Sequence, residues 1–345
     1  MLENLDHLHA MIFHPDRIPV AIAALAVVTV IGMLTGPLAG NANPFIWRVI
    51  DILFGPLGRK LNNPGRSLNE LAMRGFFLTV LGMGFALLLS RLAGSISYAY
   101  PQWRLAETLM LCLTMSAGAV WFAQLRLIQA IESDKTVKGG FLAIARTTRT
   151  DMTGSDEYTI TRLGMGLGAR SFDKAVVGPI LWFLIAGLPA AYLYAGLAAL
   201  AWRFGKEGYS KGFGSMALTL EKLMGFIPSL FSAVFIAMAG LFTPTAGMTR
   251  ALKGLGPVKN RARYEEGGMP VTALAYSLDV SLGGPSRDLE GSAIQRHWAG
   301  PEKATAKLSV KHMYRGLYLI FIAHILLLAS LLGAIVISGH DLLDF

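Results

Sequence analysis

Acidic and basic side chains gather in the segment RTDMTGSDEY at 149–158. Asp151, Asp156 and Glu157 follow Arg149 closely in the chain. Carboxylates of this kind could hold Mg²⁺ through one or two oxygens, while a neighbouring base contacts nucleotide phosphates. A solvated loop with local ion pairs explains the same composition, and both interpretations stay open at this point.

A second polar segment, SLGGPSRDLEGSAIQRHWAGP at 281–301, combines an unusual turn with charge. Gly283 and Gly284 precede Pro285, and Arg287, Asp288, Glu290 and Arg296 follow. Paired glycines before a proline fix a backbone conformation that other residues rarely adopt. The loop could place backbone amides against an anion, or it could be a structural turn.

The segment RSFDKAVVGP at 170–179 places Arg170, Asp173 and Lys174 directly before a long apolar run. Bases in this position are typical of the cytoplasmic end of a membrane-spanning helix. Just upstream, GMGLGA at 164–169 has the glycine spacing of a dinucleotide-binding loop. That fingerprint requires a preceding strand, and none is recognisable here, so we expect close helix packing instead.

These charges interrupt a strongly apolar chain. Hydrophobic residues make up 53% of the 345 and charged residues 15%, and the mean hydropathy is +0.50. Stretches near the length of about 20 residues that crosses a bilayer recur six times. The sequence therefore predicts an all-α integral membrane protein with about six transmembrane helices, broken helices in the middle and long cytoplasmic loops. The expected spans are 18–38, 75–95, 106–128, 175–202, 223–243 and 316–337, of which the fourth and fifth contain Pro179, Pro189 and Pro228.

The distribution of Lys and Arg predicts the orientation. Segments 41–74, 131–174 and 246–315 hold 23 of the 31 bases, whereas the alternate segments hold seven, among them Arg203 and Lys206. The positive-inside rule then places the three segments in the cytoplasm and both termini outside, in a bacterial inner membrane. The net charge of +9 needs no nucleic-acid partner, because topology and attraction to anionic lipid of the bilayer account for it.

The same patterns divide the chain into five regions. We expect a three-span membrane region, a cytoplasmic loop, a broken helical hairpin, a cytoplasmic segment with the LGGP loop, and a last span with a short tail. Their boundaries are 1–130, 131–174, 175–245, 246–315 and 316–345.

Several motifs, taken in order, resemble the CobD/CbiB family of membrane proteins of cobalamin biosynthesis. NPFIWRVIDILFGPLGRKLNNPGRS at 43–67, with Pro44 and Arg48, is similar to an early family segment. RTDMTGSDE, AVVGPILWFLIAGLPAA, LTLEKLMGFIPS and SLGGPSRDLEG follow in the family's order. The likeness extends over about 40–335.

The resemblance implies an adenosylcobinamide-phosphate synthase, which joins a corrinoid propionate to aminopropanol or its phosphate with ATP and Mg²⁺. It also implies a corrinoid as a binding partner, and we expect other membrane proteins or a second copy of the chain as further partners. The implied catalytic residues are Asp151, Asp156 and Glu157, with Asp151 and Glu157 as Mg²⁺ ligands. The implied substrate-binding residues are Arg48, Arg149, Asp173, Gly283, Gly284 and Arg287.

The chain also departs from the family at polar positions. An acidic family stretch corresponds here to GLGARSFDKAVVGP, so that acids and an Asn fall on Gly166, Arg170, Ser171 and Lys174. Asp173 and Glu221 could compensate nearby. The related AmpE family shares the apolar frame and is also poor in these acids, so the alternative is a catalytically silent paralogue that serves as a membrane scaffold or regulatory partner.

Overall fold

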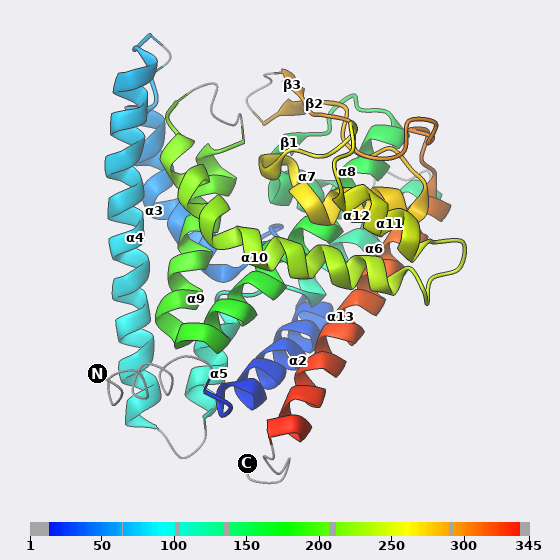
Figure 1. Ribbon diagram of the computed structural model, residues 1–345. Coiled ribbons are helices and arrows are strands. Elements are labelled where there is room, and N and C mark those ends of the chain that lie inside the picture. Colours follow the sequence, from blue (N-terminus) through cyan, green and yellow to red (C-terminus); the bar gives the residue numbers. More distant parts are fainter. Residues whose placement is uncertain are drawn as a thin grey trace.

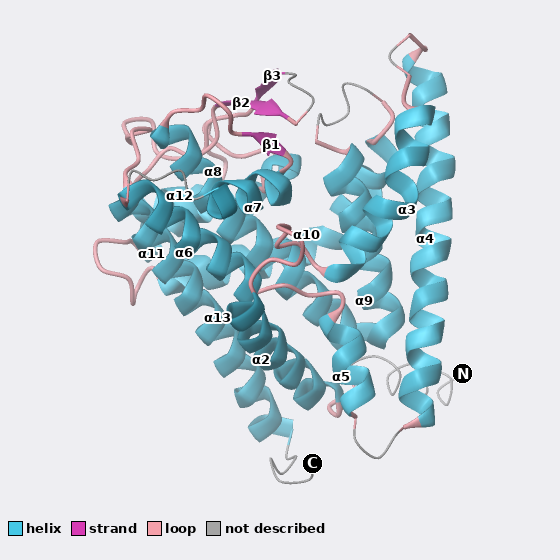
Figure 2. Ribbon diagram, turned by 180° about the vertical axis from the view of Figure 1, so that it is seen from behind, coloured by secondary structure: helices cyan, strands magenta, loops and turns pink. Residues whose placement is uncertain are grey.

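Helices form nearly all of the secondary structure, as expected. The computed structural model describes residues 14–63, 65–100, 104–133, 138–206, 212–289 and 293–338. Three short strands lie together at one end of the helical bundle (Figures 1 and 2). The helices are α2 (Arg17–Thr35), α3 (Phe45–Leu61), α4 (Leu68–Ala99), α5 (Leu105–Cys112), α6 (Gly118–Glu132), α7 (Lys138–Thr148), α8 (Glu157–Phe172), α9 (Gly178–Phe204), α10 (Ser215–Ala239), α11 (Met248–Leu255), α12 (Gly268–Leu278) and α13 (Val310–Ser338).

Five helical segments in the described residues are long and apolar enough to cross a membrane, one fewer than predicted. They are Arg17–Thr35, Leu68–Ala99, Glu157–Phe204, Ser215–Ala239 and Val310–Ile337. The expected third span, 106–128, is instead two helices, α5 and α6, separated at 113–117.

The break between α5 and α6 is stabilised by neighbouring backbone. The Ser116 N–H donates to the carbonyl of Ala175 at 3.0 Å, and the Ser116 hydroxyl donates to the carbonyl of Ala42 at 2.5 Å. Interrupted helices occur inside membrane proteins where other protein groups satisfy the freed backbone. Apolar length alone could not reveal this interruption.

The segment Glu157–Phe204 bends back on itself. A π-helical turn, η2 (Asp173–Val177), joins α8 to α9, and α9 contains non-helical backbone at Ala186 and Gly187, just before Pro189. At this bend the Arg17 guanidinium donates to the carbonyls of Leu184 and Ile185 at 3.2 and 3.0 Å. The bend therefore lies beside the start of α2, away from the strands (Figure 1).

After the bend, α9 returns to the strand end of the molecule. The Lys206 ammonium contacts the Arg149 carbonyl and lies 3.5 Å from Asp288 Oδ1. The prediction that Arg203 and Lys206 belong to an opposite, outer segment is therefore wrong, because the bend at 186–187 reverses the chain before it reaches them.

The small sheet joins two of the predicted cytoplasmic segments. β1 (Thr150–Asp151), β2 (Pro285–Asp288) and β3 (Ala293–Gln295) pair antiparallel in the order β1-β2-β3, with Asp151 opposite Arg287. Segments 131–174 and 246–315 thus lie on the same side, as their basic residues predicted.

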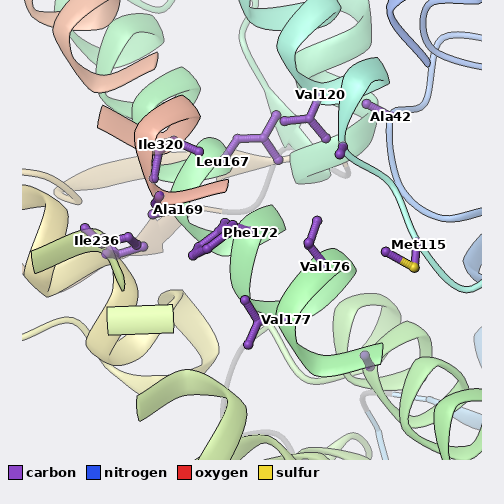
Figure 3. Close-up of a cluster of buried hydrophobic side chains, with 14 of the residues drawn as sticks. Ala42, Met115, Val120, Leu167, Ala169, Phe172, Val176, Val177, Ile236 and Ile320 are labelled. Atoms are coloured by element: carbon purple, nitrogen blue, oxygen red, sulfur yellow. The ribbon is translucent and has the colours of Figure 1, made fainter. Parts of the chain in front are cut away.

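The core surrounds the α8–η2–α9 segment. Figure 3 shows Phe172, Val176 and Val177 of this segment near Val120 of α6 and Ile236 of α10. In α8 two of the three GMGLGA glycines serve packing, as expected: a Cβ at Gly164 would lie 2.7 Å from Met313 Cε, and one at Gly168 would lie 2.8 Å from Gln124 Nε2.

The contact between α2 and α6 depends on glycine. A Cβ at Gly118 would lie 1.9 Å from the backbone oxygen of Thr29, which cannot rotate away. We expect Gly118→Ala to lower the stability by about 1–3 kcal/mol, as overpacked cores do. The matched control is Gly84→Ala in α4, where an added Cβ meets nothing within 4 Å and should leave the stability unchanged or slightly raised. Thermal unfolding of both variants in detergent checks this, and equal melting temperatures would contradict it.

Candidate functional site

Charged side chains meet in the interior at the π-helical turn η2. Lys174 Nζ lies 2.7 Å from Glu221 Oε1 of α10 and 3.4 Å from Asp173 Oδ2. Asp173, Lys174 and Glu221 are only 0, 5 and 3% exposed. Lys174 therefore does not mark a solvated membrane boundary, as the sequence suggested. It forms ion pairs with two buried acids and compensates part of their charge, which apolar surroundings otherwise make very costly.

Hydroxyl groups complete this network. Ser229 and Ser232 donate to the Asp173 carboxylate at 2.7 and 3.3 Å. The Tyr264 hydroxyl donates to Glu221 Oε1 at 2.8 Å and also contacts Lys174 Nζ. Burial, and then the Glu221 charge, raise the pKa of Tyr264, so that its phenol stays protonated as a donor. Every charge in the network thus has a partner.

Local backbone explains why these groups converge. Glu221, Gly225, Ser229 and Ser232 are spaced by three or four residues, which places them on one face of α10. A Cβ at Gly225 would lie 2.0 Å from Tyr264 Oη, so glycine makes room for the tyrosine. On the facing helix, the π turn adds one residue to the helical repeat, a feature that is frequent at functional sites.

Arg170 lies between this network and a neighbouring pocket, and its side chain lines a cavity on each side. Its guanidinium has no hydrogen bond or ion pair with any residue that the structure describes, although Glu221 and Asp173 act on it electrostatically. The side chain is half-buried, and it lines two pockets. The inner pocket is lined by Trp47, Arg170, Lys174, Trp202, Glu221 and Tyr264, among others.

The second pocket, which we call the arginine pocket, lies between α8, α12 and the segments before and after α12. Its lining residues include Arg162, Gly166, Arg170, Glu266, Gly283 and Arg296. The spacing of four residues places Arg162, Gly166 and Arg170 on one face of α8. A Cβ at Gly166 would meet nothing within 4 Å, so this glycine borders open space.

The arginine pocket carries an excess of positive charge. Arg162 donates to the Ala306 carbonyl at 2.8 Å and to the Thr159 hydroxyl at 2.7 Å, and Arg296 donates to the Thr150 hydroxyl at 3.1 Å. Burial, and then repulsion from Arg170, lower the pKa of Arg296 to about 10. Three arginines therefore face a single acid, Glu266, in this pocket.

Lys206 lies close enough to these cations for their charge to lower its pKa. Burial, and then Arg296, lower the pKa of Lys206 from 10.5 to about 7. Between pH 7 and pH 10.5 the Lys206 amine is protonated in the unfolded chain but neutral in the folded protein. This group therefore makes the free energy of unfolding rise with pH above about 7.

We expect the free energy of unfolding to rise between pH 7 and pH 9 through Lys206, by at most about 1.4 kcal/mol per pH unit. Lys206→Met, which keeps the chain length and removes the titrating amine, should make this slope shallower. Denaturant unfolding of both proteins at pH 7, 8 and 9 measures the difference. Parallel slopes would show that Lys206 titrates normally.

The structure separates the acids predicted for catalysis from the buried network. Asp156 accepts the Thr159 N–H at 2.9 Å as the N-cap of α8, and Glu157 follows in the first turn. Asp173 lies at the other end of α8, about 25 Å away at 1.5 Å per residue. Neither the inner pocket nor the arginine pocket is lined by Asp151, Asp156 or Glu157.

The implied Mg²⁺ site depends on two carboxylates, those of Asp151 and Glu157, and the described residues add no larger set of ligands to it. They contain no group of three or more His, Cys, Asp or Glu side chains placed to hold a metal. Asp151 accepts the Thr153 N–H at 2.8 Å, and this bond lowers the pKa of the Asp151 carboxyl. The pairing of Asp151 and Glu157 as Mg²⁺ ligands therefore stays a prediction.

The predicted substrate-binding residues also divide between different places. Gly283 lines the arginine pocket, and its φ of 92° confirms the unusual turn. Arg149 is buried, with its guanidinium over the Trp202 ring, and Arg287 is exposed on β2 opposite Asp151. Arg48 on α3 lines neither pocket.

Gly284 allows a tryptophan ring to pack against the same turn. A Cβ there would lie 2.4 Å from the Trp298 ring, so glycine permits the close approach of the tryptophan. The LGGP loop thus contributes two pocket residues, Leu282 and Gly283, and one packing residue, Gly284.

Sequence reasoning missed Arg162 and Tyr264, noted Arg296 only as a polar residue of 281–301, and placed Arg170 at a membrane boundary. A signal existed only for α8, where Arg162, Gly166 and Arg170 recur every four residues. For Tyr264 and Arg296 no local pattern indicates a partner so far away in the sequence.

Comparisons of the sequence with known proteins identify a family. The CobD/Cbib protein family matches residues 24–320. A relative from Brucella anthropi named Cobalamin biosynthesis protein CobD is 22% identical over 255 residues, covering 70% of this chain and 77% of the relative. Proteins of the same name from Clostridium perfringens and Sinorhizobium fredii are 23 and 28% identical, covering 54 and 43% of this chain and 60 and 46% of their own lengths. No solved structure matches. The chain therefore belongs to the CobD/CbiB family and is a multi-pass membrane protein.

Proposed function

We propose that the chain acts in cobalamin biosynthesis by joining aminopropanol or its phosphate to a corrinoid propionate in an amide bond. Family membership and the names of the relatives support the pathway. The observation that carries the proposed reaction is Arg170, an unpartnered guanidinium that lies between a buried ionic network and a pocket rich in arginine.

The reaction needs an activated carboxyl group. The propionate oxygen attacks the terminal phosphorus of the substrate ATP, and ADP leaves. The amine then attacks the carbonyl carbon of the resulting acyl phosphate, phosphate leaves, and the amine releases its proton. Negative charge develops on the carbonyl oxygen and on the phosphate in turn. Fixed guanidinium groups such as Arg170 and Arg296 stabilise this charge because they need no reorganisation during the reaction.

Growth complementation tests the proposal. A synthase-null bacterium that carries this chain should grow under conditions that require cobalamin synthesis, as it should with the control Arg261→Met. Arg261 is an exposed residue that lines neither pocket. Absence of growth, with the protein inserted at normal levels in the membrane, would reject the synthase and favour the silent membrane scaffold.

We also propose that the strand end faces the cytoplasm. In a Cys112→Ala background, a single cysteine at Tyr98, near the end of α4 away from the strands, should react with an impermeant maleimide in spheroplasts. A cysteine at Thr153, beside β1, should react only after permeabilisation. Both side chains are exposed, so accessibility reports on the side of the membrane. The reverse pattern would invert the orientation.

A further inference from the structure

The charges of the arginine pocket do not balance within the described residues. Glu266 is the only acid that lines it together with Arg162, Arg170 and Arg296. Its carboxylate already accepts the N–H groups of His297, at 3.0 and 3.2 Å, and of Arg263, at 3.1 Å. The pocket therefore holds at least two cationic side chains without a matching anion.

Arg170 is the least compensated of these cations. Arg162 and Arg296 each donate to a neighbouring oxygen, whereas the Arg170 guanidinium donates to none in the described part of the chain. The acids that act on it electrostatically, Asp173 and Glu221, are bound to Lys174, serine hydroxyls and Tyr264, and neither forms an ion pair with Arg170 in the described part of the chain. A guanidinium removed from bulk water and left without a partner is unfavourable, and a bound anion would remove this cost.

The place of this cation is also the place where the family resemblance expects acids. Arg170 and Lys174 stand where a metal-dependent site would have carboxylates or amides, and the described residues offer no cluster of metal ligands. Two charge-neutralising devices, a metal held by acids or a set of arginines, can serve the same phosphate oxygens. The described residues of this chain provide the set of arginines.

We infer that the arginine pocket binds a phosphate group directly through Arg170 and Arg296, without a divalent metal ion. The ligand chemistry is a phosphate monoester or the terminal phosphate of a nucleotide. Planar guanidinium groups suit it because each can donate two parallel hydrogen bonds to phosphate oxygens. The inference rests on the proposed function for the kind of ligand. Phosphate binding can be measured without catalysis, so either proposal can be rejected while the other holds.

Equilibrium dialysis of the full chain in nanodiscs with radiolabelled inorganic phosphate, in excess EDTA, tests the inference. We expect saturable binding that Mg²⁺ changes by less than about twofold, and a loss of at least about tenfold in Arg170→Met and Arg296→Met. Arg261→Met should bind as the wild type does.

Gly166→Leu supplies a variant that keeps every cation. Leucine favours a helix more than glycine does, and its side chain would extend into the open space beside Gly166, so folding should persist while phosphate is excluded. Competition by ATP or by aminopropanol phosphate then shows which phosphate the pocket prefers. Binding that requires Mg²⁺, or that survives in Arg170→Met and Gly166→Leu, would overturn the inference. Intact binding in a chain that fails to complement growth would reject only the proposed function.

Discussion

Lys174→Met is expected to lower the free energy of unfolding by about 3–5 kcal/mol, because it leaves two buried carboxylates without their cation. Asp173 and Glu221 are almost inaccessible, and Lys174 Nζ lies within 3.4 Å of both. The remaining hydrogen-bond donors, two serine hydroxyls and Tyr264, carry no charge, and Arg170 acts on both acids without forming an ion pair with either. Denaturant unfolding in detergent measures the effect.

A double variant separates charge from packing. Lys174→Met with Glu221→Gln removes one base and one acid together, so it should recover a large part of the lost stability. If the ion pair were unimportant, the two substitutions would simply add. A single Lys174→Met variant as stable as the wild type would contradict the buried network.

Arg170→Met is expected to reduce amide formation by about 100-fold or more, the usual loss when a charge-stabilising donor is removed. Its effect on stability should be the opposite of that of Lys174→Met. Since no described group pairs with the Arg170 guanidinium, replacing it should leave the melting temperature unchanged or raise it. A loss of activity with an unchanged or raised melting temperature indicates that Arg170 contributes to ligand binding and not to folding.

Arg170→Lys and Arg261→Met are the controls. Lysine keeps the charge but loses the planar donor pair, so an intermediate activity is expected. Arg261→Met should be fully active. A loss of activity in Arg170→Met that accompanies a fall in stability would mean that Arg170 acts only through the fold.

The sequence predicted the architecture where apolar length and charge act locally. The helical class, most of the spans and the shared side of 131–174 and 246–315 were predicted from hydropathy and from Lys and Arg positions. These patterns are reliable because the hydrocarbon of the bilayer excludes unsatisfied polar groups at every position of a span.

The site could not be predicted in the same way. Arg170 and Lys174 have the composition of a membrane boundary, and only contacts with Glu221 and Tyr264, far along the chain, make them interior residues. Likewise the bend at Gly187 returned Lys206 to the strand end, and the break at 113–117 depends on Ala42 and Ala175. Such features arise from packing between distant segments, which a single sequence does not display.

The most direct test is a reaction of the purified chain in nanodiscs with a corrinoid bearing the free propionate, aminopropanol phosphate, ATP and MgCl₂, followed by mass spectrometry. The account predicts the corrinoid amide from the wild type and from Arg261→Met, and at least about 100-fold less of it from Arg170→Met. No amide from folded wild-type protein, or equal amounts from all three proteins, would contradict it.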